Sequence, residues 1–356
     1  MKFFHLLLPV FAGLWPGAAP ADIAPAEWVQ QALDTTRAPG IAMGVSKNGE
    51  MDIAAAGLRA RHHDANVTPS DLWHIGSNTK SMTATLVARM FEAGLINWDD
   101  TVGAVLGDDI AVDPAFANIT YADLLTHRSG LRVNIGLADT RRLTGTLAER
   151  DMMADRLSYA ASVLSEPPKG DKGTFLYSNA GYVVVGAMLQ QSTGQSWETL
   201  IKTHVFDPLG MASAGFGAPG SPDVVDQPRG HRGLRVRAVP PGPAADNIPA
   251  LGPAGTVHVN VADMLTYLQA HASRDPDFLT ADNWARLQTP VGDRYAMGWM
   301  ETPQGWLAHD GSNTMWYATA GFVPGTDHTV FMAANFAGWG SVARMMARGA
   351  IGALED

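Results

Sequence analysis

Hydrophobic positions in the first hundred residues switch between helical and strand-like spacing. Residues 26–37 place their apolar side chains on one face of a helix. Apolar runs at 41–46 and 51–56 then flank an Asn-Gly pair, which is typical of a tight hairpin turn. From Ser77 onward the apolar spacing is helical again, and Gly94 is well placed to end that helix. The pattern therefore predicts helix, hairpin and helix in this order.

The middle of the chain reads as helices separated by loops. Residues 182–191 form an apolar helix that ends near Gly194, and residues 197–205 form another. Residues 215–253 are rich in Gly, Pro and Arg and have weak periodicity. We expect long loops there, which either border a binding site or are a tolerated surface excursion.

The last hundred residues return to strand-like runs joined by short turns. These runs cover residues 297–300, 305–309, 316–323 and 329–334. Such a succession predicts an antiparallel meander. Residues 341–354 then read as a closing helix.

Strands near both ends of the chain are most simply joined into one sheet. The expected fold class is α/β of the α+β type, with an antiparallel β-sheet flanked by N- and C-terminal helices. We assign residues 22–75 and 252–356 to this sheet and its helices, and residues 76–251 to an inserted, mainly helical domain.

The first residues have the pattern of an export signal. Lys2 precedes a short apolar run, and Ala19-Pro20-Ala21 supplies small residues at the spacing of a cleavage site. We expect a signal peptide over residues 1–21, cleaved after Ala21, and hence a periplasmic or secreted protein. The apolar run is too short for a permanent membrane anchor.

Composition narrows the classes of partner. The chain has 356 residues, a net charge of −10 and no cysteine, so neither disulfides nor a cysteine-anchored lipid are expected. No basic run favours nucleic acid, and an acidic surface repels phosphates. The local cluster His62-His63-Asp64 reads as a solvated loop, so we expect no metal and no cofactor. The sequence leaves the oligomeric state open.

The segment Ser77-Asn78-Thr79-Lys80 is the strongest chemical signal. A serine and a lysine three positions apart share a helix face, so the Lys80 amine can help to remove the proton of the Ser77 hydroxyl. A helix N-terminus also offers unpaired N–H groups to developing negative charge. Taken alone, the pair is more typical of a capping serine with a solvated lysine one turn later, and the rest of the chain must decide.

A second motif is Tyr177-Ser178-Asn179. If Tyr177 lies near the Lys80 ammonium, the opposite charge lowers the pKa of the phenol, and Tyr177 can serve as base and then as acid. Asn179 offers its amide to a substrate carbonyl and to Lys80. The alternative is an ordinary helix cap.

The third motif, His309-Asp310-Gly311-Ser312, follows a predicted strand. Gly311 allows close approach of a substrate to the backbone. The N–H groups of Ser312 and Ser77 can together form an oxyanion hole. His309 can contact a substrate carboxylate or the Tyr177 hydroxyl, or it can be a turn histidine with one local hydrogen bond.

With these three motifs in this order, the chain resembles the serine β-lactamase and penicillin-binding-protein family, in its class C-like branch. That branch also holds D-peptidases, D-amino-acid amidases and carboxylesterases. The resemblance covers nearly the whole mature chain and extends to framework motifs at residues 124–131, 207–211, 253–256 and 297–299. It implies a two-step acyl transfer through Ser77, with Lys80 and Tyr177 sharing the proton transfers and a small molecule or peptide as substrate.

Two departures from the family pattern bear on the substrate. The third motif usually begins with lysine in true β-lactamases, whereas His309 resembles the versions of D-peptidases and esterases. A lysine suits a substrate carboxylate, but histidine is mostly neutral at pH 7. Trp316 makes the following turn bulky and either narrows or floors the site, and Asn134 is a further candidate for the pocket lining.

The leading hypothesis is an exported serine hydrolase that cleaves an amide, peptide or ester bond through a Ser77 acyl-enzyme. The first alternative is a true class C β-lactamase that hydrolyses β-lactam antibiotics. The second is a non-catalytic penicillin-binding or cell-wall-peptide-binding protein. No G-x-S-x-G segment supports an α/β-hydrolase.

Overall fold

The predicted hairpin is present and opens the central sheet. The computed structural model describes residues 24–338 and 341–355. Strands β1 (Gly40–Lys47) and β2 (Glu50–Gly57) pair along their whole length. Asn48 and Gly49 both have positive φ angles, 55° and 78°, as the turn between such strands requires.

One antiparallel sheet joins the two ends of the chain. Its order is β2-β1-β11-β10-β9-β8, and β1 pairs with β11 so that Ile41 lies opposite Ala334. The meander that completes it consists of β8 (Met300–Glu301), β9 (Leu307–Ser312), β10 (Tyr317–Phe322) and β11 (Thr329–Ala334). The predicted fold class is confirmed.

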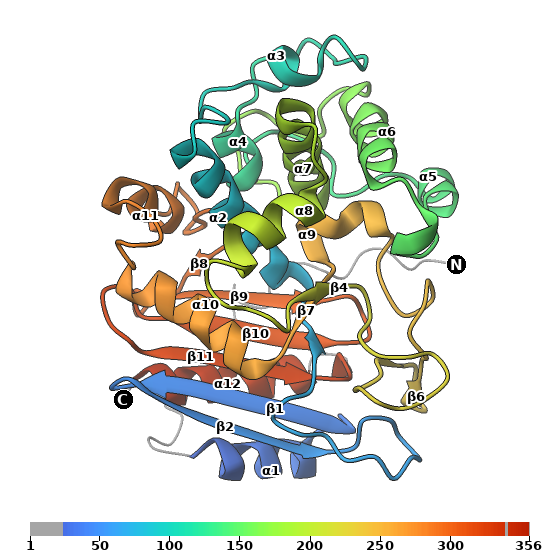
Figure 1. Cartoon of the computed structure of the whole chain (residues 1–356), viewed down its shortest axis with the longest axis vertical. Coiled ribbons are helices and arrows are strands. Elements are labelled where there is room, and N and C mark those ends of the chain that lie inside the picture. Colours follow the sequence, from blue (N-terminus) through green and yellow to red (C-terminus); the bar gives the residue numbers. More distant parts are fainter. Residues whose placement is uncertain (1–23, 339–340, 356) are drawn as a thin grey trace.

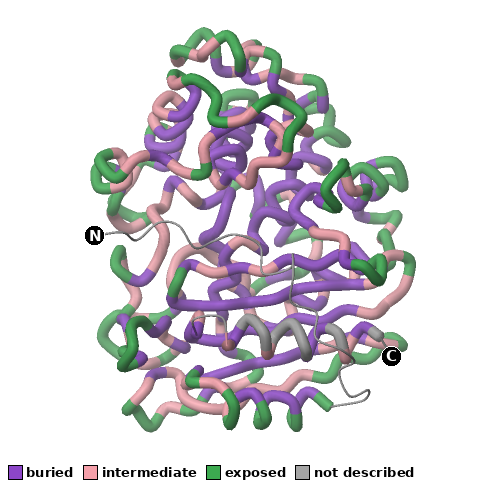
Figure 2. Tube along the Cα trace, turned by 180° about the vertical axis from the view of Figure 1, so that it is seen from behind, coloured by how far each residue is buried: buried purple, intermediate pink, exposed green. Residues whose placement is uncertain are grey.

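Helices cover both faces of this sheet (Figure 1). The terminal helices α1 (Pro25–Thr35) and α12 (Ser341–Glu355) pack on one face and α10 (Val261–Ser273) on the other. Strand residues alternate accordingly: Ile41 belongs to the hydrophobic cluster under the terminal helices, whereas Ala42 belongs to the larger cluster that includes α10. Figure 2 shows that the inner strands of the sheet are largely buried, whereas the edge strand β2 is intermediate to exposed.

The helical part stands on one side of the sheet, around α2 (Thr79–Glu92) and α7 (Asn179–Thr193). Eleven residues of α7, from Ala180 to Gln190, are buried, because α7 packs against neighbouring helices on several sides. The other helices are α3 (Val102–Leu106), α4 (Tyr121–Leu125), α5 (Leu137–Arg142), α6 (Met152–Leu164), α8 (Trp197–Ile201), α9 (Gly252–Gly255) and α11 (Ala281–Gln288).

The chain crosses between the sheet and the helical part at two adjacent places. Strand β3 (Trp73–His74) precedes α2 and pairs with β7 (Val257–Val259), which follows α9 and pairs in turn with β4 (Gly215–Phe216). The division into residues 22–75 with 252–356 and residues 76–251 remains a prediction. Helix α11, from the second sheet segment, packs against α2.

Three sequence expectations need adjustment. Residues 297–299 do not form a strand, because Gly298 has φ 83° and lies directly against the backbone of Ser81. The helix expected from Ser77 begins at Thr79, after a 3₁₀ turn over Gly76–Asn78. The loops of residues 215–253 contain a small hairpin of β5 (His231–Arg232) and β6 (Arg237–Ala238).

Within residues 24–338 and 341–355, no helix is long and apolar enough to cross a bilayer. The predicted signal peptide and its cleavage point after Ala21 lie outside the described residues.

Candidate active site

The 3₁₀ turn before α2 presents Ser77 where sheet and helical part meet. Gly76 adopts φ 53°, a conformation that glycine accepts without strain. The Gly76 N–H donates to His74 Nδ1 at 3.2 Å, and the Asn78 side-chain amide donates to the Ile75 carbonyl at 3.0 Å. Ser77 is partly exposed, whereas the residues before and after it are buried. The turn is therefore fixed on both sides of an accessible hydroxyl.

Lys80 lies beneath this hydroxyl. Its Nζ is 3.0 Å from Ser77 Oγ and 2.7 Å from the carbonyl oxygen of Ala254, in α9. The side chain is fully buried, and Nζ lies 5.0 Å from the ring centre of Tyr177 and 5.5 Å from that of Tyr182. The sequence-predicted pairing of serine and lysine is thus present in space.

Burial lowers the pKa of the Lys80 ammonium well below its usual value, and no carboxylate in the described part of the chain offsets this. A neutral amine has one free electron pair, which can accept the Ser77 proton, while an N–H group donates to Ala254. Lys80 is therefore suited to act as a base at a lower pH than an exposed lysine.

The expectation that Lys80 lowers the pKa of Tyr177 is wrong. Burial raises the pKa of the Tyr177 phenol, and a hydrogen bond with Ser77 opposes this only partly. The physical reason is that Lys80, buried in the same place, is itself held toward its neutral form. Tyr177 is consequently a proton donor in the resting site.

Ser178 and Asn179 mainly organise the start of α7. Ser178 Oγ accepts from the Gly181 N–H at 3.0 Å and donates to the Arg132 carbonyl at 2.7 Å, so it is a helix cap. The Asn179 amide donates to Asn134 Oδ1 at 3.0 Å, and not to Lys80 as one expectation had it. The structure thus brings together the two asparagines proposed for substrate binding.

The third motif approaches the nucleophile turn with the backbone of Gly311 and Ser312. A Cβ atom on Gly311 would overlap the Ile75 carbonyl oxygen and lie 2.8 Å from the Ser77 nitrogen. A Cβ atom on Gly76 would likewise overlap the Ser312 nitrogen. Glycine at both positions therefore lets the amides of Ser77 and Ser312 approach one another, as the proposed oxyanion hole requires.

His309 faces the same side of the sheet as Gly311, but its ring is buried and engaged. Nδ1 lies 2.6 Å from the Asp310 carbonyl oxygen and Nε2 lies 3.2 Å from the Tyr295 hydroxyl, so its hydroxyl partner is Tyr295 and not Tyr177. Burial lowers the pKa of His309 to about 3, and it is neutral at pH 7. Asp310 alternates to the opposite face, where Thr319 donates to its carboxylate and burial raises its pKa to about 6.

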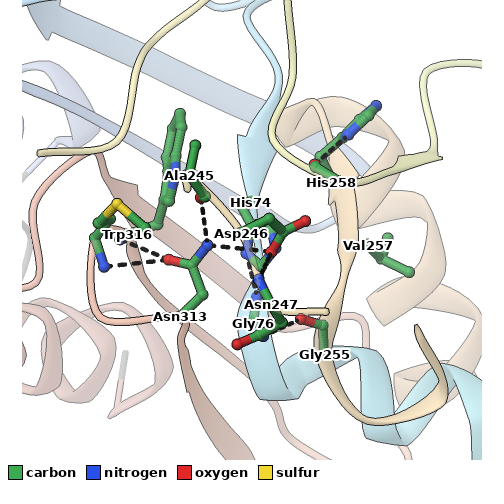
Figure 3. A network of polar contacts seen from close by, with 12 residues as sticks. His74, Gly76, Ala245, Asp246, Asn247, Gly255, Val257, His258, Asn313 and Trp316 are labelled. Carbon is green, nitrogen blue, oxygen red and sulfur yellow. Dashed lines mark hydrogen bonds and ion pairs between the residues drawn. The ribbon is translucent and has the colours of Figure 1, made fainter. Parts of the chain in front are cut away.

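A loop from residues 245–247 braces the first motif from behind (Figure 3). Asp246 Oδ1 lies 2.7 Å from His74 Nε2, and His74 in turn accepts the Gly76 N–H. The neighbouring Asn247 amide donates at 2.8 Å to the carbonyl of Gly255, next to the residue that bonds Lys80. Part of the long loop region therefore supports both the nucleophile turn and the base.

Trp316 is buried, so its ring does not narrow the site. The indole is 1% exposed and packs edge-on against Trp73, with ring centres 6.3 Å apart.

The sequence did not predict the parts played by Ala254, Asp246 and Tyr295. Ala254 lies in a motif that looked like framework only, and its contribution is a backbone carbonyl, which no side-chain pattern reveals.

The chain matches the family model described as Beta-lactamase over residues 26–354. It is 28% identical over 327 residues to penicillin-binding protein 4 of Amycolatopsis lactamdurans, covering 85% of this chain and 82% of that protein. It is also 27% identical over 303 residues to an unguisins hydrolase of Aspergillus campestris, covering 79% of this chain and 54% of that protein.

Solved structures share the fold. An octameric penicillin-binding protein homologue from Pyrococcus abyssi superposes with a TM-score of 0.73 at 24% identity, over 91% of this chain and 75% of that one. A D-stereospecific amidohydrolase from Streptomyces sp. superposes with a TM-score of 0.70 at 18% identity, over 90% of this chain and 98% of that one.

Proposed function

Since this chain belongs to the Beta-lactamase family, we propose that it is a serine hydrolase that cleaves an amide, peptide or ester bond through an acyl-enzyme on Ser77. The observation that carries the proposal is the contact between a buried Lys80 amine and the Ser77 hydroxyl, at 3.0 Å. A capping serine with a solvated lysine would not have this geometry. Similarity to a protein named as a hydrolase supports the reaction class.

Acylation begins with attack of Ser77 Oγ on the substrate carbonyl carbon. Lys80 Nζ takes the hydroxyl proton, and the N–H groups of Ser77 and Ser312 receive the negative charge of the tetrahedral oxygen. Tyr177 gives its proton to the departing oxygen or nitrogen as the bond to carbon breaks. Transfer of the proton from Lys80 to Tyr177 restores both groups to their neutral forms.

Deacylation uses the same groups in reverse. Lys80 takes a proton from a water molecule, whose oxygen attacks the acyl carbonyl carbon. The oxyanion again lies between the amides of Ser77 and Ser312. The bond between Ser77 Oγ and the acyl carbon then breaks, and Oγ regains its proton from Lys80.

The state of His309 favours substrates without a carboxylate beside the reacting bond. A buried imidazole whose pKa is about 3 provides no positive charge at pH 7, and both of its nitrogens already have partners. β-Lactam antibiotics carry such a carboxylate. The observation therefore favours an esterase-like or amidase-like enzyme over a true class C β-lactamase.

A substrate panel tests this preference. Initial rates are compared for p-nitrophenyl acetate, a D-alanyl peptide whose C-terminus is amidated, the same peptide with a free carboxylate, and nitrocefin. We expect turnover of the ester or of the amidated peptide. The two substrates that carry a carboxylate, the free peptide and nitrocefin, should be turned over more slowly. Fast nitrocefin hydrolysis without esterase or peptidase activity would instead identify a β-lactamase.

Tyr177→Phe is expected to lower kcat by about 10²-fold, because the ring stays in place while the proton donor is lost. The loss should be larger for an alkyl ester or amide than for a p-nitrophenyl ester, whose leaving group departs without a proton. Steady-state rates with the two ester classes measure this difference. Near-normal rates with the alkyl ester would remove Tyr177 from the proton transfers.

The non-catalytic alternative is separable by labelling. A fluorescent phosphonate probe should modify the wild-type protein and not Ser77→Ala. Equal labelling of both, or labelling of neither, would favour a binding protein.

Export is a further part of the proposal. Amino-terminal sequencing of protein recovered from the periplasm or medium tests for cleavage after Ala21.

A further inference from the structure

Two buried histidines from different motifs lie on either side of one tyrosine hydroxyl. His127 follows α4, His309 lies in β9, and Tyr295 lies between α11 and β8. Tyr295 Oη is 3.2 Å from His127 Nε2 and 3.2 Å from His309 Nε2. The three side chains are 0%, 6% and 1% exposed for His127, His309 and Tyr295, so water does not replace these contacts.

Backbone groups at the two ends set the direction of the hydrogen bonds. The Ser178 N–H donates to His127 Nδ1 at 3.0 Å, so a neutral His127 carries its proton on Nε2 and donates it to Tyr295. The Asp310 carbonyl oxygen only accepts, so His309 carries its proton on Nδ1 and accepts at Nε2. Tyr295 therefore receives from His127 and donates to His309, which leaves each group satisfied.

Both histidines remain neutral in this arrangement. Burial lowers the pKa of His127 well below its usual value and that of His309 to about 3. A proton on His127 Nδ1 would also face the Ser178 N–H, which is a donor itself.

The ends of this chain of bonds lie beside the catalytic groups. The His127 ring packs against the Tyr177 ring, with centres 4.3 Å apart, and holds the amide of the next residue. His309 is two residues before Gly311 and three before Ser312 in the same strand. The Tyr295 hydroxyl thus links the proton donor to the strand that supplies the oxyanion amide.

We propose that Tyr295 is a positioning residue, whose hydroxyl joins His127 to His309 and so holds Tyr177 and the Gly311–Ser312 backbone in their reactive arrangement. This inference rests on the proposed hydrolase function. It also gives His309 a role within the protein, in place of contact with a substrate carboxylate.

Tyr295→Phe keeps the ring and removes only the linking hydroxyl. We expect kcat to fall by about 10²-fold, as misplacement of reacting groups does, while KM changes little. The matched control is Tyr267→Phe, which removes an equally buried hydroxyl that bonds to Thr85 at 3.0 Å. The control should lose a similar amount of thermal stability and keep its kcat within about threefold, well short of the loss that misplaced reacting groups cause. Equal kcat in wild type and Tyr295→Phe would overturn the inference.

Nitrogen NMR of the imidazole rings tests the arrangement without any substrate. The wild type should show His127 protonated at Nε2 and His309 protonated at Nδ1, with signals assigned through His127→Gln and His309→Gln. In Tyr295→Phe both Nε2 signals should move, because one loses its acceptor and the other its donor. The opposite tautomer at either histidine would overturn the inference, whether or not the protein is a hydrolase.

Discussion

Ser77→Ala is expected to lower kcat by about 10⁵-fold, leaving only the residual rate that binding and the oxyanion amides provide. The side chain is the one accessible group of a rigid turn whose neighbours are buried, so its loss removes the nucleophile and little else. Steady-state rates with the best ester or amide of the panel measure the effect.

The matched control is Ser81→Ala, which removes the same kind of hydroxyl four residues later, in the first turns of α2. Ser81 is buried, and its Oγ donates to the Asn78 carbonyl at 2.8 Å. This variant should stay within about threefold of the wild-type rate, since it loses only contacts to the Asn78 carbonyl and to Tyr267, neither of which has a part in the proposed mechanism. Comparable activity in Ser77→Ala and Ser81→Ala would mean that another group is the nucleophile.

Lys80→Met is expected to lower kcat by about 10³-fold, because methionine fills the same space but accepts no proton. In the wild type, kcat/KM should rise with pH as Lys80 loses its proton, and this rise should fall well below the usual range of a lysine because burial lowers its pKa. The small activity left in Lys80→Met should lack that rise. A pH–rate profile of both proteins from pH 4 to 9 measures it.

Although Lys80→Met lowers activity, it should raise the thermal stability of the protein at low pH. The unfolded lysine is protonated below about pH 10.5, whereas the buried native Lys80 is neutral down to its lowered pKa. Between these two values the unfolded chain binds more protons, so wild-type stability increases with pH. Lys80→Met should therefore unfold at a higher temperature than the wild type at low pH, and the gap should narrow toward pH 10.5. A gap independent of pH would show that Lys80 is charged in the native protein.

Local patterns carried the sequence predictions that succeeded. The Asn-Gly hairpin, the glycines that end α2 and α7, and the three-residue spacing of Ser77 and Lys80 depend on neighbouring positions only. The closure of the sheet between β1 and β11 followed from needing partners for strands at both ends of the chain. Local spacing and the pairing needs of the strands are therefore enough to predict these features.

The electrostatics of the site depended on burial, which the sequence does not display. Tyr177 was expected to have a lowered pKa from its charged neighbour, but both groups are enclosed, and desolvation dominates each of them. For the same reason His309 looked available for a substrate, while the fold turns it toward Tyr295. The sequence identifies the motif residues, but their protonation states depend on burial and follow only from the structure.

Contacts through the backbone and between distant loops were also beyond the sequence. The acceptor for Lys80 is the carbonyl of Ala254, and the support behind the nucleophile turn comes from Asp246 in a loop without periodicity. The residue type of Ala254 or Asp246 does not by itself indicate these contacts. Three-dimensional proximity across more than 150 positions is what gives them one.

Trapping the covalent intermediate tests the central claim most directly. The wild-type protein is mixed with the p-nitrophenyl ester, quenched in acid within one turnover, and analysed by intact mass and by peptide mapping. We predict a mass increase equal to one acyl group, located on Ser77 and absent from Ser77→Ala. Turnover without any adduct, or an adduct on another residue, would contradict the assignment of Ser77 as the nucleophile.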